Sequence, residues 1–226
     1  MGSLPSDSFG YQVHPDHPAA YVTWTDAQAF VSALNEAAGR DIYRLPTEAE
    51  WEFACRAGTR TLWSYGVEVE NLGFGEYPML VDNAWISDNA CPQFDDCDGT
   101  APCGDCFARP VGWKPANPWG IHDMHGNVWE WVLDGPRVFS ESEVTDPLGP
   151  MDGVQRVRRG GDISGSAFRW THHMITTSAY RSIVTGDNAH FYATGARLVR
   201  VDDGTTRPGE TLRRSNGWGE VKRQSR

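Results

Sequence analysis

Two acidic residues and the turn between them are the part of this sequence best suited to chemistry. Asp123 and Glu130 lie in the run Asn117 to Trp131, NPWGIHDMHGNVWEW, with Gly126-Asn127 between them. A Gly-Asn pair bends the backbone back, so both carboxylates and the intervening carbonyl groups can converge on one point. Such an all-oxygen cage suits calcium. Glu130 lies between two tryptophans and needs a partner, because an isolated buried charge is very costly. The same residues also fit an ordinary turn in which Glu130 accepts hydrogen bonds from backbone amides.

A second candidate metal site is a cluster of four cysteines with the spacing C-x5-C-x5-C-x2-C. The cluster consists of Cys91, Cys97, Cys103 and Cys106. Four thiolates this close could hold a structural zinc ion in a tetrahedral site. Two disulfides are the rival interpretation and would fit an oxidising compartment, and four free thiols are the third. The fifth cysteine, Cys55, lies on the inner face of a predicted helix and is expected in the core.

Composition and charge exclude several classes of function. The chain has 226 residues, enough for one large domain or one domain with tails. Its net charge of −10 argues against a nucleic-acid-binding surface, which needs Lys and Arg for phosphates. No apolar run is long enough to span a membrane. The first residues, MGSLPSDSFGYQ, have no apolar signal core, so the cytoplasm or a virion is the expected location.

Two helices are predicted in the first quarter of the chain. The first covers Thr25 to Gly39, with a capping box between Thr25 and Gln28 and a glycine stop. The second starts at Thr47, with Glu50 completing a capping box, and ends at Gly58. Both helices are amphipathic and should therefore pack on a sheet.

The predicted sheet takes its strands from the second half of the chain. They are Trp129 to Val132, Gln155 to Arg159 and the closing strand Gly195 to Val201. Asn71 to Asn117 is expected to form one long set of loops.

Three motifs in a fixed order carry a resemblance to a known family. They are RLPTEAEWEFACRAGT (Arg44 to Thr59), the Asn117 to Trp131 run and RVRRGG (Arg156 to Gly161). Together they resemble the formylglycine-generating-enzyme (sulfatase-modifying factor) domain family, over about Pro18 to Val199. The resemblance implies an α+β fold of the C-type-lectin-like kind, with two helices packed on a small twisted sheet and long loops. The expected organisation is an irregular lead-in over 1–19, the domain over 20–201 and a polar tail over 202–226.

The same resemblance implies two structural calcium sites. One uses the side chains of Asp123 and Glu130 and the carbonyl groups of Gly126 and Val128. The other uses Asn83 and a downstream acid, which the Cys-rich segment leaves unplaced.

The chain departs from the family where the chemistry should be. Formylglycine-generating enzymes need two C-terminal cysteines that bind copper and activate oxygen, and no cysteine follows Cys106. The family positions fall near His173 and Ser178, and a serine hydroxyl cannot replace a thiolate toward a soft metal. His172 and His173 are adjacent, so on a strand they would point to opposite faces and not share a metal. No catalytic residue is therefore assigned. The alternative is an enzyme of the same superfamily with unrecognised oxidative chemistry.

The segment Asp162 to Thr194 has an unusual composition that points to ligand binding instead. It contains no Lys, Glu or Gln. Randomising the first two bases of AAY asparagine codons yields a set that also excludes these three, together with Met and Trp; only Trp170 and Met174 fall outside that set. The segment resembles the variable region of a target protein of a diversity-generating retroelement. A short Glu-poor region arising by chance is the alternative.

Rigid aromatic and short polar side chains are the mixture favoured in adaptable binding faces. We therefore expect this face to bind a protein or other macromolecular ligand, with no common ligand among relatives. Ala179 and Arg181 are expected in the fixed scaffold. The candidate variable residues are Asp162, Ile163, Phe168, His172, His173, Ile175, Thr176, Tyr180, Ile183, Val184, His190, Phe191 and Tyr192.

Overall fold

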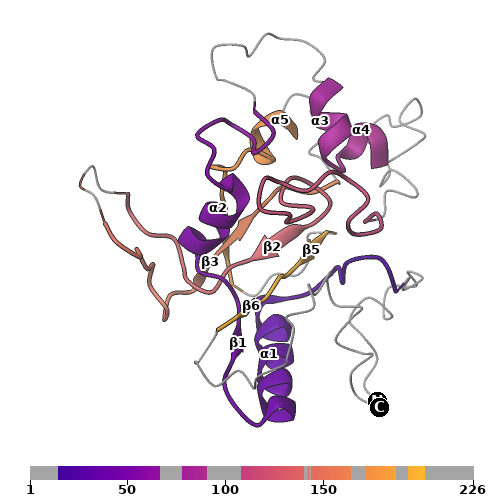
Figure 1. Cartoon of the computed structure of the whole chain (residues 1–226). Coiled ribbons are helices and arrows are strands. Elements are labelled where there is room, and N and C mark those ends of the chain that lie inside the picture. The colour runs from indigo at the N-terminus through magenta and orange to yellow at the C-terminus, as the bar shows by residue number, and fades with distance from the viewer. Residues whose placement is uncertain are drawn as a thin grey trace, which may run out of the picture.

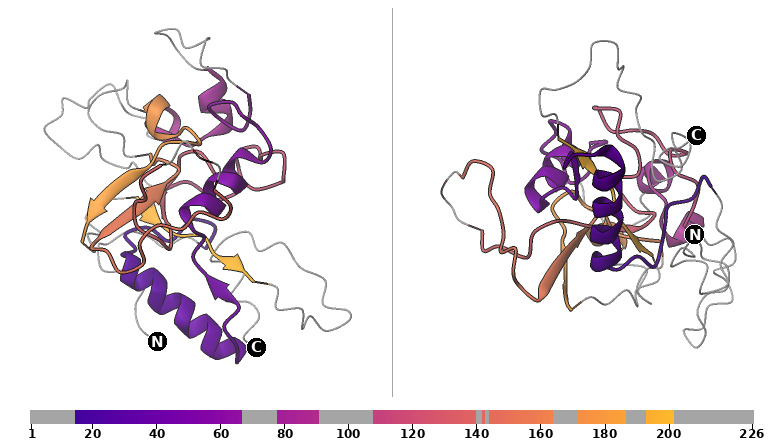
Figure 2. Two further views of the ribbon diagram at one scale, coloured as in Figure 1. Left: turned by 90° about the vertical axis from the view of Figure 1, so that its left-hand side faces the viewer. Right: turned by 90° about the horizontal axis from the view of Figure 1, so that it is seen from below.

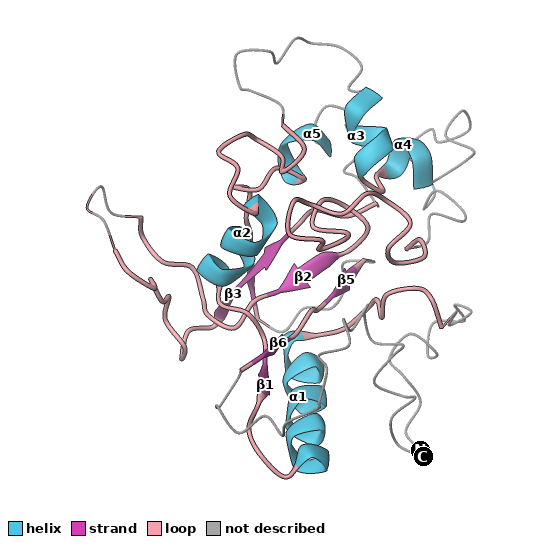
Figure 3. Cartoon of the chain, in the orientation of Figure 1, coloured by secondary structure: helices cyan, strands magenta, loops and turns pink. Residues whose placement is uncertain are grey.

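The computed structural model describes residues 15–66, 78–90, 108–139, 142, 144–163, 172–186 and 193–201. Its helices are α1 (Trp24–Ala38), α2 (Glu48–Arg56), α3 (Pro78–Asn83), α4 (Ser87–Ala90) and α5 (His172–Ile175). Its strands are β1 (Tyr43–Arg44), β2 (Trp129–Trp131), β3 (Gln155–Arg159), β4 (Ser182–Thr185), β5 (Thr194–Gly195) and β6 (Val199–Arg200). Few helices and short strands joined by long loops give the expected α+β architecture (Figure 3).

The N-cap of helix α1 lies two residues before the N-cap that the sequence predicts. Its N-cap is Thr23, whose hydroxyl accepts a hydrogen bond from the Asp26 amide at 2.9 Å. The Asp26 carboxylate in turn accepts the Thr23 amide at 3.1 Å, so the capping box is Thr23–Asp26 rather than Thr25–Gln28. Because Asp26 carries a negative charge close to the positive end of the helix dipole, it is favoured there over a neutral Gln. The predicted stop at Gly39 is confirmed, with a φ of 69°.

Helix α2 follows its prediction closely. Thr47 is the N-cap and Glu50 completes the capping box. The left-handed residue that ends the helix is Ala57, one position before the predicted Gly58.

Four strands form a mixed sheet in the order β4-β3-β2-β5 (Figure 1). Strand β3 is antiparallel to both β2 and β4, whereas β5 runs parallel to β2. The predicted closing strand is split, because Thr194–Gly195 pairs with β2 and Val199–Arg200 pairs with β1 in a separate two-stranded sheet. The chain therefore crosses from one sheet to the other between β5 and β6.

The two faces of the sheet pack against different helices. Val157 and the neighbouring Val132 contact Trp51 and Cys55 of α2. Trp131, which points the other way along β2, packs with Ala27 of α1. Alternating side chains on a strand lie on opposite faces, so β2 presents Glu130 to one side and its two tryptophans to the other.

The remaining helices lie at the end of the molecule away from α1. Figures 1 and 2 place α1, β1 and β6 at one end and α3, α4 and α5 at the other, with the four-stranded sheet between them. None of the helices in the part of the chain that the structure describes is long and apolar enough to cross a membrane.

Candidate functional site

Glu130 is buried and its charge is met by an arginine. The Arg197 Nε and Nη2 atoms lie 2.5 and 2.6 Å from the two carboxylate oxygens of Glu130. The indole N–H of Trp51 donates a third hydrogen bond to the same carboxylate at 2.6 Å. A two-pronged guanidinium–carboxylate pair is among the strongest charged contacts in proteins, and it supplies the partner that the sequence required.

Arg197 occupies the space between Glu130, one of the predicted calcium ligands, and the backbone next to another, Asp123. Nη2 of Arg197 also donates to the backbone carbonyl groups of His122 and Asp123, at 3.2 Å each. The turn between the two acids is confirmed: Gly126 has a φ of 79°, and a Cβ there would lie 2.1 Å from the Trp85 carbonyl oxygen. Calcium at Asp123, Gly126, Val128 and Glu130 stays a prediction, and an ion there would have to share Glu130 with Arg197 or displace its guanidinium.

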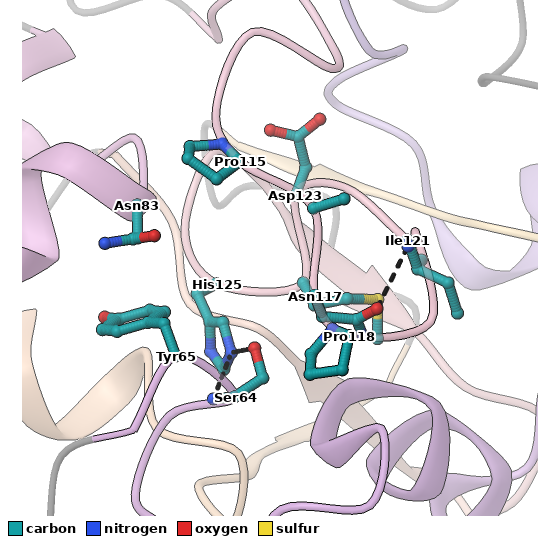
Figure 4. A pocket seen from close by; sticks show the side chains of 11 residues that line it. Ser64, Tyr65, Asn83, Pro115, Asn117, Pro118, Ile121, Asp123 and His125 are labelled. Atoms are coloured by element: carbon teal, nitrogen blue, oxygen red, sulfur yellow. Dashed lines mark hydrogen bonds between the residues drawn. The ribbon is translucent and has the colours of Figure 1, made fainter.

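Asn83, assigned to the other calcium site, ends α3 and donates its side-chain amide to the Met79 carbonyl at 2.7 Å. It borders a cavity of about 250 Å³ that Asp123 also borders. Figure 4 shows Asn83 and Tyr65 along one side of this cavity and Asn117 and Pro118 along the other. Within the described ranges, no three His, Cys, Asp or Glu side chains gather as metal ligands.

His125 lies beside this cavity and is locked in one neutral form. Its Nδ1 lies 2.8 Å from the Thr176 carbonyl oxygen, which can only accept, so Nδ1 carries the proton. Its Nε2 accepts the backbone N–H of Ser64 at 3.2 Å. Burial lowers the pKa of His125 to about 4, so the imidazole is uncharged at neutral pH.

The position expected for a copper-binding cysteine is also buried. Ser178 is fully buried, and its backbone N–H donates to the Leu62 carbonyl at 2.8 Å. Burial raises the pKa of Cys55 to about 12, so this thiol stays protonated. A hydroxyl and a protonated thiol do not fit a thiolate copper site.

Arg158 organises the opposite face of the sheet. Its guanidinium lies over the rings of Trp129 and Trp131, 5.2 and 5.7 Å from their centroids. It donates to the hydroxyls of Thr194 at 2.9 Å and Ser182 at 3.0 Å. Burial lowers its pKa to about 10, against the opposing influence of nearby Asp162 and Tyr180. Both ends of the Asp162 to Thr194 segment therefore meet at Arg158, and the Tyr180 ring lies 6.0 Å from that of Trp129.

Arg159, the next residue, ties the same segment to α2. It pairs with Glu48 at 3.3 Å and with Glu52 at 2.6 Å. It also donates to the carbonyl groups of Ser178 at 2.7 Å and Ala179 at 3.1 Å. Arg181 pairs with Glu48 as well, at 3.2 Å, which places it in the scaffold as the sequence predicts.

Three candidate variable residues are buried, so they do not belong to an outward face. Ile163 packs with Ala90 and Val128, and the Thr176 hydroxyl accepts the indole N–H of Trp63 at 3.1 Å. Asp162 is 4% exposed beside Arg158. The burial of these three residues could not be predicted from their positions in the sequence, because it depends on how the segment leaves the sheet and returns to it.

The other candidates divide into two groups. Ile183 is exposed, whereas Ile175, Tyr180 and Val184 are half-buried. The backbone of His172 and His173 forms the start of α5, so the strand geometry considered for them does not apply. The remaining predicted residues lie outside the described part of the chain; they are Phe168, His190, Phe191, Tyr192, Cys91, Cys97, Cys103 and Cys106.

Sequence comparison matches residues 3–210 to the family described as the sulfatase-modifying factor enzyme 1-like domain. The formylglycine-generating enzyme of Bos taurus is 36% identical over 156 residues, which cover 65% of this chain and 35% of that protein. The formylglycine-generating enzyme of Streptomyces coelicolor is 36% identical over 159 residues, covering 65% and 42%. The serine/threonine-protein kinase pkn1 of Chlamydia caviae is 35% identical over 150 residues, covering 64% and 19%. The matched part thus spans well under half of each of these relatives.

Two solved structures share the fold. PvdO from Pseudomonas aeruginosa superposes with a TM-score of 0.63 at 25% identity, over 85% of this chain and 65% of that one. Treponema denticola variable protein 1 superposes with a TM-score of 0.62 at 24% identity, over 83% and 72%. With the family match covering most of the sequence, the chain belongs to the sulfatase-modifying factor enzyme 1-like domain family.

Proposed function

We propose that this chain is a non-catalytic binding protein whose Asp162 to Thr194 segment supplies a retroelement-diversified surface for a protein or other macromolecular ligand. The observation that carries the proposal is the composition of this segment, which lacks Lys, Glu and Gln in a chain with 30 acidic residues. All of its residues except Trp170 and Met174 are reachable from randomised asparagine codons, and such side chains are the kind that adaptable binding faces use.

The way the scaffold holds this segment supports the proposal. His125 bonds the Thr176 carbonyl, Arg159 bonds the carbonyls of Ser178 and Ala179, and the Ser178 N–H reaches Leu62. All of these contacts use the main chain of the segment. A residue there can therefore change without losing them, which is what a variable surface on a stable framework requires.

The buried residues limit how much of the segment can vary. Ile163, Thr176 and Ser178 each fill space in the core, and inserting larger side chains at such positions is costly. Among the described positions, we assign variation to Ile175, Tyr180, Ile183 and Val184. The fold is compatible with this role, since a solved protein of the same fold is named a variable protein.

An enzyme with unrecognised oxidative chemistry is the second candidate, favoured by the names of the relatives from Bos taurus and Streptomyces coelicolor. The lack of any cysteine after Cys106 argues against their activity in this chain. Oxygen consumption with copper, a thiol reductant and a cysteine-containing peptide distinguishes the two candidates. We expect no oxygen uptake above that of a control with copper, reductant and peptide but without the protein. Uptake that depends on the protein would favour the enzyme.

The genome of the source tests the proposal itself. We expect a near-duplicate of the Asp162 to Thr194 coding segment beside a reverse-transcriptase gene, with adenines at the positions that differ. A gene with neither neighbour would refute retroelement diversification.

A further inference from the structure

A second, larger cavity lies on the side of β2 that carries Glu130. Its volume is about 480 Å³, within the range of small-molecule sites, roughly 300–1,000 Å³. Apolar walls enclose it on several sides, formed by Phe30, Trp51, Trp119, Ile121 and Leu198. Trp119 is 47% exposed and packs edge-on against Phe53, with ring centroids 4.9 Å apart.

Among the described carboxylates that line this cavity, Asp123 is the one that forms no ion pair with a described residue. Glu130 and Arg197 neutralise each other, and Glu50 is paired at 2.6 Å with Arg44. The remaining carboxylate is Asp123, whose Oδ2 accepts the backbone N–H of Gly112 at 2.7 Å.

Two histidines also line the cavity, and one of them is His122. Its Nδ1 donates to the Lys114 carbonyl at 2.7 Å. The other, His17, lies near the start of the described chain. A mostly apolar cavity with one carboxylate outside any printed ion pair is complementary to a molecule that has an apolar body and a single positive charge.

This cavity is separate from the proposed variable surface. Glu130 and Arg197 lie on the α2 side of the sheet, whereas Arg158, Trp129 and Tyr180 lie on the other. A ligand in the cavity would contact none of the residues to which we assign variation, so both sites could be occupied together.

We propose that this cavity binds a small organic cation, an ammonium group on an aromatic or aliphatic stem. The ammonium donates to the carboxylate of Asp123, and the stem lies against Trp119 and Ile121. Hydrogen bonds between an ammonium and a carboxylate are the stronger, charge-assisted kind, and an indole face adds attraction for a nearby cation. The ammonium can belong to a free amine or to a lysine side chain of another protein.

Calorimetric titration of the full chain in EDTA-containing buffer tests this site. The probes are tryptamine, its anionic counterpart indole-3-propionate, and N-acetyl-lysine methylamide. We expect one of the two cations to bind and the anion not to bind. Binding of tryptamine alone assigns the site to free amines, and binding of the lysine derivative alone assigns it to a protein lysine. Failure of both cations, or equal binding of the anion, overturns the proposal.

Two variants locate the binding. Asp123→Asn keeps the acceptor for Gly112 and suits the left-handed φ of 56° at this position, so the fold should persist. We expect it to weaken binding of the cation by about tenfold or more, because a charged hydrogen bond is lost. Asp152→Asn is the matched control, since Asp152 is exposed and distant from the cavity lining, and it should leave the affinity unchanged. Equal affinities for the two variants would overturn the assignment to Asp123.

Discussion

Trp129 and Glu130 are neighbours on β2, and their side chains lie on opposite faces of the sheet. Trp129 supports the ring cluster around Arg158, and Glu130 anchors Arg197 and Trp51. At this scale the sequence predicted that Glu130 needs a partner, and it offered calcium or backbone amides. The Arg197 partner was missed because it lies 67 residues away, and nothing local to Glu130 indicates which distant side chain will reach it.

Removing the charge of Glu130 should destabilise the fold. In Glu130→Gln the Trp51 hydrogen bond can persist, but the Arg197 guanidinium loses its counter-charge. We expect a loss of about 2–3 kcal/mol in the free energy of unfolding, less than for a fully buried pair because Arg197 is partly exposed. Urea denaturation measures it, with Glu36→Gln on the exposed side of α1 as the control. Equal stability of the two variants would contradict the role given to this ion pair.

His125 should make the fold sensitive to mild acid. Its pKa is about 4 in the folded chain but about 6.5 in the unfolded chain. Only the unfolded state therefore binds a proton here as the pH falls from 6.5 toward 4, and stability is lost across that window. Above pH 6.5 the contribution is fully present.

Between pH 7.5 and 5 the loss from this residue is about 2 kcal/mol. Asp123 acts in the opposite direction, since its raised pKa lets the folded state bind a proton first. Urea denaturation of the wild type and of His125→Gln at both pH values isolates the contribution of His125. A variant with the same pH dependence as the wild type would show that His125 is not the source.

At the scale of elements, local signals predicted α2 well and α1 less well. Thr47 and Glu50 form one clear capping box, so α2 has one possible start. Before α1 the sequence offers two, Thr23–Asp26 and Thr25–Gln28, and the charged carboxylate decides between them. The split of the last strand was not predictable, because it depends on pairing with β1 and β2, which lie far away in the sequence.

The two candidate caps of α1 can be tested directly. Thr23→Ala removes the side chain that caps the helix and should cost about 1 kcal/mol. Thr25→Ala changes an exposed residue within the first turn and should cost less than about 0.5 kcal/mol. Thermal or urea unfolding compares the two variants. A larger loss of stability for Thr25→Ala than for Thr23→Ala would favour Thr25 as the N-cap instead.

For the whole molecule, the family fold was predictable because three motifs in order span most of the chain. The metal content was not predictable, because the spacing of the four cysteines fits zinc, disulfides and free thiols alike. Cys91, Cys97, Cys103 and Cys106 also lie outside the described residues. We expect either one zinc ion or two disulfides in this cluster. Disulfides would stabilise the fold because they restrict the unfolded chain. Zinc would stabilise it because the ion binds the folded chain.

Metal analysis and thiol counting of the purified protein distinguish the two possibilities. EDTA should lower the melting temperature if zinc is bound, and a reductant should do so if disulfides are present. A decrease on the order of 5 °C is expected in either case. Adding calcium alone after the EDTA treatment, and measuring the melting temperature again, shows whether a calcium ion at Asp123 and Glu130 contributes separately. Four reactive thiols with an unchanged melting temperature would contradict both forms of the cluster.

Deep sequencing of the gene from many sibling isolates tests the central claim most directly. We predict amino-acid differences concentrated between Asp162 and Thr194, at exposed or half-buried positions such as Tyr180 and Ile183. Arg158, Arg159 and Glu130 should not vary, because the framework depends on them. One unchanging sequence across that segment, or differences scattered evenly along the gene, would contradict a diversified binding surface.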